Sequence, residues 1–109
     1  MVKKIEFTYD GKDYCLEYTR RTVEEMENAG FNIDEITNKP MTMLPLLFKG
    51  SFRAHHRNIK PALVDIIFKA MPNKEELFAK LSEMYFAPID SLMEESEGDE
   101  GNIEWGANW

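Results

Sequence analysis

The sequence has little of what several function classes require. Its single cysteine, Cys15, cannot form an internal disulfide and lacks the paired spacing of zinc motifs. No apolar run approaches the roughly 20 residues of a membrane span, and the N-terminus lacks the apolar segment of a secretory signal. Glycine-rich phosphate loops, nucleophile elbows and paired catalytic carboxylates are also absent. We therefore expect a soluble intracellular protein that is not an enzyme, with no catalytic, cofactor-binding or metal-binding residues.

Basic residues are also few. The chain has 13 Lys and Arg against 20 Asp and Glu, a net charge of −7. This balance argues against nucleic-acid binding, which requires clustered positive charge. Residues 94–109 hold six acids and no base, so residues 1–93 carry a net charge of only −1. With 43% apolar residues, the 109-residue chain can build a core. We predict a single domain at 1–93 and a flexible acidic tail at 94–109.

The first predicted element is a β-hairpin. Apolar and polar residues alternate over 5–9 and again over 14–18, which is the pattern of two strands. Gly11 in the intervening segment accepts the positive φ of a tight turn. A lone hairpin is marginal in water, so it must pack on helices or pair with a further strand. A third strand at 31–36 remains an alternative.

A short helix is predicted next. Thr22 and Glu25 have the spacing of a capping box, and Thr19 is an alternative N-cap. Gly30 is expected to end this helix in a left-handed cap, with Phe31 packing back onto it.

Three further helices follow in the predicted order. The second covers 42–56, where Gly50 allows a neighbour to approach closely. The third covers 61–71 and is apolar almost all round, which predicts a central place in the core. The fourth starts at Asn73, in a capping box with Glu76, and should kink or divide near Pro88. The expected fold class is α+β and mostly helical.

The polar side chains that attract attention are interpreted as structural. Adjacent helical residues point about 100° apart, so His55 and His56 should not share a metal; we expect His55 partly buried and His56 exposed. Cys15 has no local base to activate its thiol, so we interpret it as packing. Arg53 and Arg57, four residues apart, could grip an acidic partner segment or the tail of the chain itself.

The acidic tail contains Trp105 and Trp109, both flanked by polar residues. Tryptophan is costly to leave in water and is a favoured interface anchor. Two alternatives remain: the tryptophans fold back on the domain, or they dock on a partner.

Several stretches together resemble the small tail assembly chaperones of long-tailed bacteriophages and prophages from Gram-positive hosts. The resemblance covers nearly the whole chain and is carried by residues 3–14 and 16–19, 26–31, 40–56, and 73–77 with 84–85, and by Asn102 and Trp105 in the tail. It includes no catalytic motif, so it transfers no active site.

The resemblance implies a non-enzymatic function. Chaperones of this kind coat the tape measure protein, recruit subunits of the major tail protein, and leave before the tail is finished. The expected location is therefore the host bacterial cytoplasm, with no copy in the mature virion. Many such chaperones are also made in a longer, frameshifted form, and whether one exists here stays open. The oligomeric state stays open as well, although rings or stacks of copies suit such proteins.

A tape measure is a long amphipathic helix, and an apolar groove could cover it. We expect that groove beside the second helix, with additional docking through the tail; the expected partner-binding residues are Leu46, Phe48, Phe52, His55, Trp105 and Trp109. The alternative is a prophage-encoded adaptor or scaffolding module that docks through its acidic, tryptophan-bearing tail. A small hydrolase or metal-dependent enzyme is the least favoured hypothesis.

Overall fold

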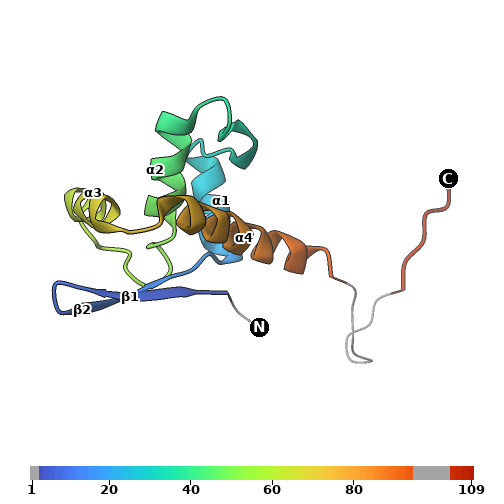
Figure 1. Cartoon of the computed structure of the whole chain (residues 1–109). Helices are drawn as coiled ribbons and strands as arrows, with labels where there is room; N and C mark the ends of the chain where they lie inside the picture. Colours follow the sequence, from blue (N-terminus) through green and yellow to red (C-terminus); the bar gives the residue numbers. More distant parts are fainter. Residues whose placement is uncertain (1–2, 95–103) are drawn as a thin grey trace.

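A β-hairpin lies against a group of helices in the computed structural model, which describes residues 3–94 and 104–109 (Figure 1). This arrangement confirms the α+β, mostly helical fold class. The elements in chain order are β1 (Ile5–Tyr9), β2 (Lys12–Leu16), α1 (Arg20–Asn28), the 3-10 helix η1 (Ile33–Glu35), α2 (Pro40–Gly50), α3 (Pro61–Ala70) and α4 (Lys74–Leu92).

The two strands pair antiparallel, and Tyr9 faces Lys12 at the closed end. Asp10 (φ 49°) and Gly11 (φ 77°) form the turn, and positive φ at both positions is typical of the turn that best fits strand twist. The hairpin prediction is confirmed. The alternative of a third strand at 31–36 is excluded, because Ile33–Glu35 forms a 3-10 helix.

Helix α1 is capped by Thr19 rather than Thr22. The Thr19 hydroxyl accepts a hydrogen bond from the Thr22 N–H at 3.1 Å. In return, the Thr22 hydroxyl accepts one from the Thr19 N–H at 2.8 Å. The predicted capping box of Thr22 with Glu25 is therefore wrong and the alternative cap at Thr19 is confirmed, since a threonine at the third helical position returns the bond itself.

The end of α1 confirms the predicted left-handed cap. Gly30 has a φ of 102°, its N–H bonds the Glu27 carbonyl at 3.0 Å, and the Phe31 N–H bonds the Met26 carbonyl at 2.9 Å. These two bonds satisfy carbonyls that a helix end would otherwise leave unpaired. The cap also turns Phe31 into the core, where it is only 4% exposed.

Helix α2 is the central element, because it packs against α1, α3, α4 and η1. It begins at Pro40, where the missing N–H costs nothing, and not at the predicted Thr42. The predicted close approach at Gly50 is confirmed: the Met26 side chain occupies the place where a Cβ on Gly50 would lie.

Helix α2 ends at Gly50, six residues before the predicted His56. The Ser51 N–H bonds the Phe48 carbonyl at 3.1 Å rather than the carbonyl of Leu47. The Leu47 carbonyl instead accepts a hydrogen bond from the buried Tyr18 hydroxyl at 2.5 Å. A long-range hydrogen bond therefore accompanies the end of the helix, and the chain continues to 55 as turns.

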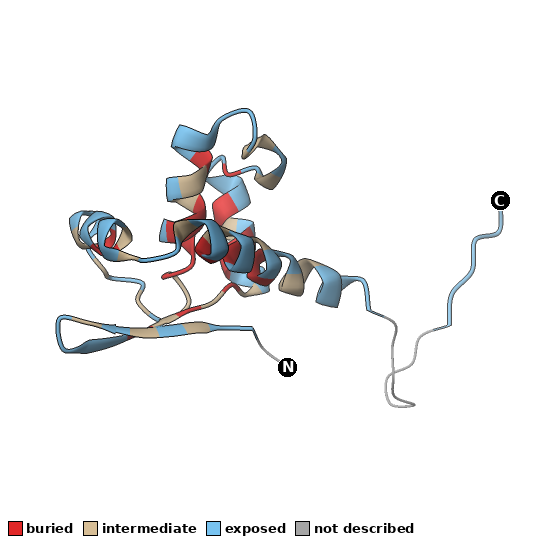
Figure 2. Ribbon diagram, in the orientation of Figure 1, coloured by how far each residue is buried: buried red, intermediate tan, exposed pale blue. Residues whose placement is uncertain are grey.

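Helix α3 is peripheral, so its predicted central place is wrong. Only Val64 and Ile67 are buried on it, and Ile66 is 51% exposed. Figure 2 shows buried residues concentrated where α1, α2 and α4 meet. Helices α1, α2 and α4 contact one another in pairs, whereas the main helix contact of α3 is with α2, so the core forms among the first three.

Helix α4 buries a stripe made of Leu77, Leu81, Met84 and Tyr85. Its N-cap Asn73 has a φ of 51° and makes no side-chain capping bond, so the predicted capping box with Glu76 is wrong. The helix continues through Pro88 to Leu92 and is not divided there. Among residues 3–94 and 104–109, no helix combines the length and apolar character needed to cross a bilayer.

Candidate functional site

The last turns of α4 leave apolar side chains in water. Phe86 is 41% exposed, Leu92 62% and Met93 79%. Scattered apolar residues on a surface are normal, but Leu92 also lines a depression, and an exposed apolar side chain at a depression is a candidate interaction site.

Such a depression lies between α1 and α4, and we call it the α1–α4 groove. One part, of about 330 Å³, is lined by Arg20, Val23, Glu24, Glu27, Pro88, Ile89 and Leu92. An adjoining part, of about 500 Å³, is lined by Glu27, Gly30, Phe31, Asn32, Ile33, Asp34, Tyr85 and Ile89. The two parts adjoin, because Glu27 and Ile89 line both of them, and together they make up the α1–α4 groove.

The groove has an apolar floor and a mainly acidic rim. Val23, Phe31 and Tyr85 are buried beneath it, and burial raises the pKa of the Tyr85 phenol to about 12, so the phenol stays neutral. On the rim, Arg20 bonds the Ser91 carbonyl at 3.3 Å and links the start of α1 to the end of α4. The groove can therefore accept an apolar segment whose flanks carry positive charge.

In the described chain, the four residues predicted to form a groove beside the second helix do not line one common groove, although a depression of about 280 Å³ beside the end of α2 is lined in part by Phe52. Phe48 and Phe52 are each 1% exposed and therefore belong to the core. Their rings pack edge to face, with centroids 5.1 Å apart. Leu46 is half-buried and lines only a small depression of about 60 Å³. His55 is exposed and lies elsewhere, beside Glu17.

The tail tryptophans do not pack on the described core. Trp105 is 85% exposed and Trp109 is 103% exposed. The structure therefore does not have the arrangement in which the two tryptophans fold back on the domain. Most of the predicted acidic tail, residues 95–103, lies outside the described residues.

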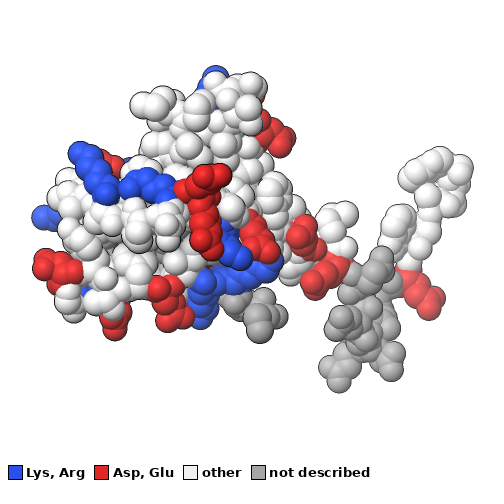
Figure 3. All heavy atoms as spheres, viewed as in Figure 1, with Lys and Arg blue, Asp and Glu red and all other residues white. Residues whose placement is uncertain are grey.

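Arg53 and Arg57 form ion pairs with Glu25, which belongs to the same domain. The Glu25 carboxylate lies 3.2 Å from Arg57, 3.4 Å from Arg21 and 3.6 Å from Arg53. The hydrogen bond from Arg57 is the main cause that holds the pKa of Glu25 below its ordinary value. The proposed link of the two arginines to the tail therefore has a competitor inside the domain. On the face in Figure 3, acidic and basic side chains are interspersed.

The two histidines have the opposite burial to that predicted: His55 is exposed and His56 is half-buried. His56 Nε2 accepts a hydrogen bond from the Cys15 N–H at 3.0 Å, and burial is the main cause that lowers the pKa of the imidazole. His55 Nε2 lies 2.6 Å from a Glu17 carboxylate oxygen. Their places are exchanged because α2 ends at Gly50, which rotates the following residues off the predicted helical stripe.

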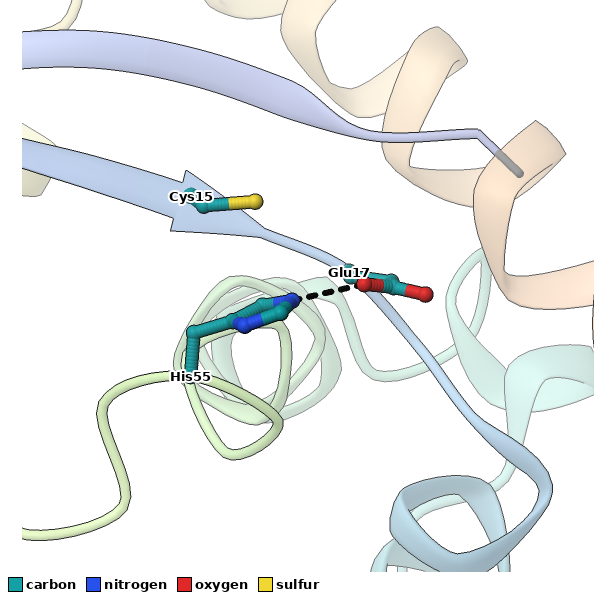
Figure 4. A group of neighbouring side chains, drawn as sticks. All are labelled: Cys15, Glu17 and His55. Atoms are coloured by element: carbon teal, nitrogen blue, oxygen red, sulfur yellow. Dashed lines mark hydrogen bonds and ion pairs between the residues drawn. The ribbon is translucent and has the colours of Figure 1, made fainter.

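Cys15 lies in the same cluster. Its thiol, the Glu17 carboxylate and the His55 imidazole offer donor atoms that all lie within 4.8 Å of one another (Figure 4). Burial raises the pKa of the Cys15 thiol, which is the opposite of what a reactive nucleophile requires. Sequence reasoning missed this cluster, since nothing in the sequence connects position 15 with position 55.

Comparison with known proteins places the chain in a family. The model of the family described as a domain of unknown function (DUF5055) matches residues 1–109, so the chain belongs to this family. No curated protein and no solved structure matches the chain.

Proposed function

We propose that this protein is a non-enzymatic binding protein that covers an apolar helical segment of another polypeptide. The observation that carries the proposal is the α1–α4 groove, with its apolar floor and the exposed Leu92 at one end. Helix-in-groove recognition uses this combination: apolar anchors on a helix fill the groove, and rim charges select the flanking residues.

The resemblance to phage tail assembly chaperones supports a more specific proposal. The segment would then be part of the tape measure protein, which many copies of this chain would coat before subunits of the major tail protein are added. Many weak contacts along one partner give avidity without a large single interface. A net charge of −7 on each copy would keep the coated complex soluble.

A second candidate is an adaptor or scaffolding module that docks through its tail. The observation that favours it is the exposure of Trp105 and Trp109, since tryptophan is enriched among interface anchors. In this function the partner provides the pocket and the groove is not needed.

Co-expression with a tape measure protein, followed by pull-down of the tagged chain, tests both candidates. Leu92→Asp places a charge in the groove at an exposed position, and we expect capture to weaken about 30-fold, the value of a strong anchor. Ile66→Asp is the matched control, because Ile66 is similarly exposed but lies on α3, away from the groove.

The double variant Trp105→Ala, Trp109→Ala separates the two candidates. Loss of capture in this variant, with normal capture by Leu92→Asp, would replace the first proposal by the second. Failure of the unmodified chain to form any complex would count against the tape measure partner.

A further inference from the structure

Three side chains that can ligate a metal converge where β2 leaves the hairpin. Cys15 and Glu17 are two residues apart on an extended segment, so their side chains point to the same side. His55 comes from the turns after α2 and faces them (Figure 4). From these contacts we propose that Cys15, Glu17 and His55 form a zinc site with three protein ligands and one open coordination position.

The donor set favours zinc over the other common divalent ions. Zinc binds sulfur, imidazole nitrogen and carboxylate oxygen, and sites with three protein ligands leave a fourth position for water or an added donor. Magnesium and calcium prefer oxygen alone and gain nothing from a thiolate. The cluster also differs from the groups of acidic side chains that are common on protein surfaces, because only one of its three residues is an acid.

The backbone that carries the ligands is already fixed. The Glu17 N–H bonds the Ser51 carbonyl at 3.0 Å, and the Cys15 N–H bonds His56 Nε2 at 3.0 Å. Leu16, between the two ligands, is fully buried. The extended segment and the turns are thus held together before any metal arrives, which lowers the cost of assembling the site.

Small side-chain movements would complete the site. Ligand atoms around a tetrahedral zinc lie about 3.5 Å apart, given bond lengths of about 2.0–2.3 Å. The three donors here lie within 4.8 Å of one another, and the Glu17–His55 pair is already at 2.6 Å. The side chain of His55 is 39% exposed, so an ion can reach it from water. The metal would replace the direct Glu17–His55 contact and clip the hairpin to the end of α2.

The site shares no residue with the α1–α4 groove, so it stands or falls independently of the proposed function. Titration of the metal-free chain with Zn²⁺ by calorimetry should give one ion per chain and raise the unfolding temperature, because a ligand that binds only the folded state stabilises it. Mg²⁺ should do neither. Co²⁺ in place of Zn²⁺ should show the charge-transfer absorption of a thiolate–cobalt bond.

Two variants and a control make the test specific. Cys15→Ser should abolish the thiolate absorption. His55→Ala should weaken Zn²⁺ binding about 100-fold, because removal of a residue that only supports a metal ligand already costs about 10- to 100-fold in affinity. Because His55 is exposed, its replacement leaves the core intact. Asp65→Asn, an exposed acid on α3, should bind as the unmodified chain does.

The proposal would be overturned by the absence of Zn²⁺ binding, or by binding that survives in both Cys15→Ser and His55→Ala. It would also be overturned by a Co²⁺ complex of the unmodified chain that lacks the thiolate absorption.

Discussion

The hydroxyl of Tyr18 donates a hydrogen bond to the carbonyl oxygen of Leu47, 29 residues further along the chain, at 2.5 Å. Tyr18 lies just after β2, and Leu47 lies in the last turn of α2. The carbonyls at a helix end have no partner within the helix, and a buried one must find a partner elsewhere. The hairpin exit therefore supplies a cap to the central helix, and burial raises the pKa of the Tyr18 phenol well above its ordinary value.

Replacement of Tyr18 by Phe removes this cap and leaves the Leu47 carbonyl buried without its partner. We expect the free energy of unfolding to fall by about 1–3 kcal/mol, the cost of an unsatisfied buried polar group. Urea unfolding followed by far-ultraviolet circular dichroism would measure it. Tyr9→Phe is the matched control, since the half-buried Tyr9 makes no such bond in the described structure. Equal losses in the two variants would contradict the role of Tyr18.

Replacement of Gly30 by Ala should also destabilise the fold. Gly30 has a φ of 102°, and an L-residue in the left-handed half of φ space is strained even where there is room for its Cβ. We expect a loss of about 1–2 kcal/mol on thermal or urea unfolding. Gly106→Ala, at a tail position with open space and no positive φ, should leave stability unchanged. A neutral Gly30→Ala variant would mean that the end of α1 does not need its left-handed residue.

The cluster of Glu25 with three arginines predicts a dependence of stability on pH. The pKa of Glu25 is lowered in the folded state, so its contribution is complete above the ordinary value of 4.5 and is lost as the pH falls through the lower, folded value. We expect Glu25→Gln to be destabilising at pH 7 and to differ less from the unmodified chain at pH 3. Unfolding temperatures measured at both values would show this.

Glu24→Gln is the control for this experiment. Glu24 is an exposed neighbour on α1 and takes no part in the arginine cluster. A pH dependence as large in Glu24→Gln as in Glu25→Gln would show that general charge, and not the arginine cluster, is responsible.

Local patterns in the sequence predict the local structure well. Alternation and the Asp10–Gly11 turn predict the hairpin, because strand period and positive φ depend only on near neighbours. Gly30 predicts the end of α1 for the same reason. The choice between Thr19 and Thr22 as the N-cap was ambiguous, since both can begin the same helix and only the backbone decides.

Several features that the sequence does not predict depend on residues far apart in the chain. The end of α2 depends on Tyr18, and the α1–α4 groove depends on the packing of two helices whose lining residues, such as Val23 and Ile89, have no shared pattern. An apolar stripe predicts which residues are buried, but it does not predict whether the core of the same domain or another molecule covers them. The stripe that contains Phe48 and Phe52 therefore predicts a binding surface, although both side chains are buried in the core.

The position of the only two tryptophans has a practical consequence for spectroscopy. Both lie in the tail and are exposed, whereas Tyr14, Tyr18 and Tyr85 are buried. Indole emission should therefore be that of tryptophan in water and should barely change when the domain melts, while the tyrosine signal follows the core. The chain thus contains two separate optical reporters. A blue shift of the indole band on mixing with another molecule would report capture of the C-terminal segment while the tyrosine signal remains constant.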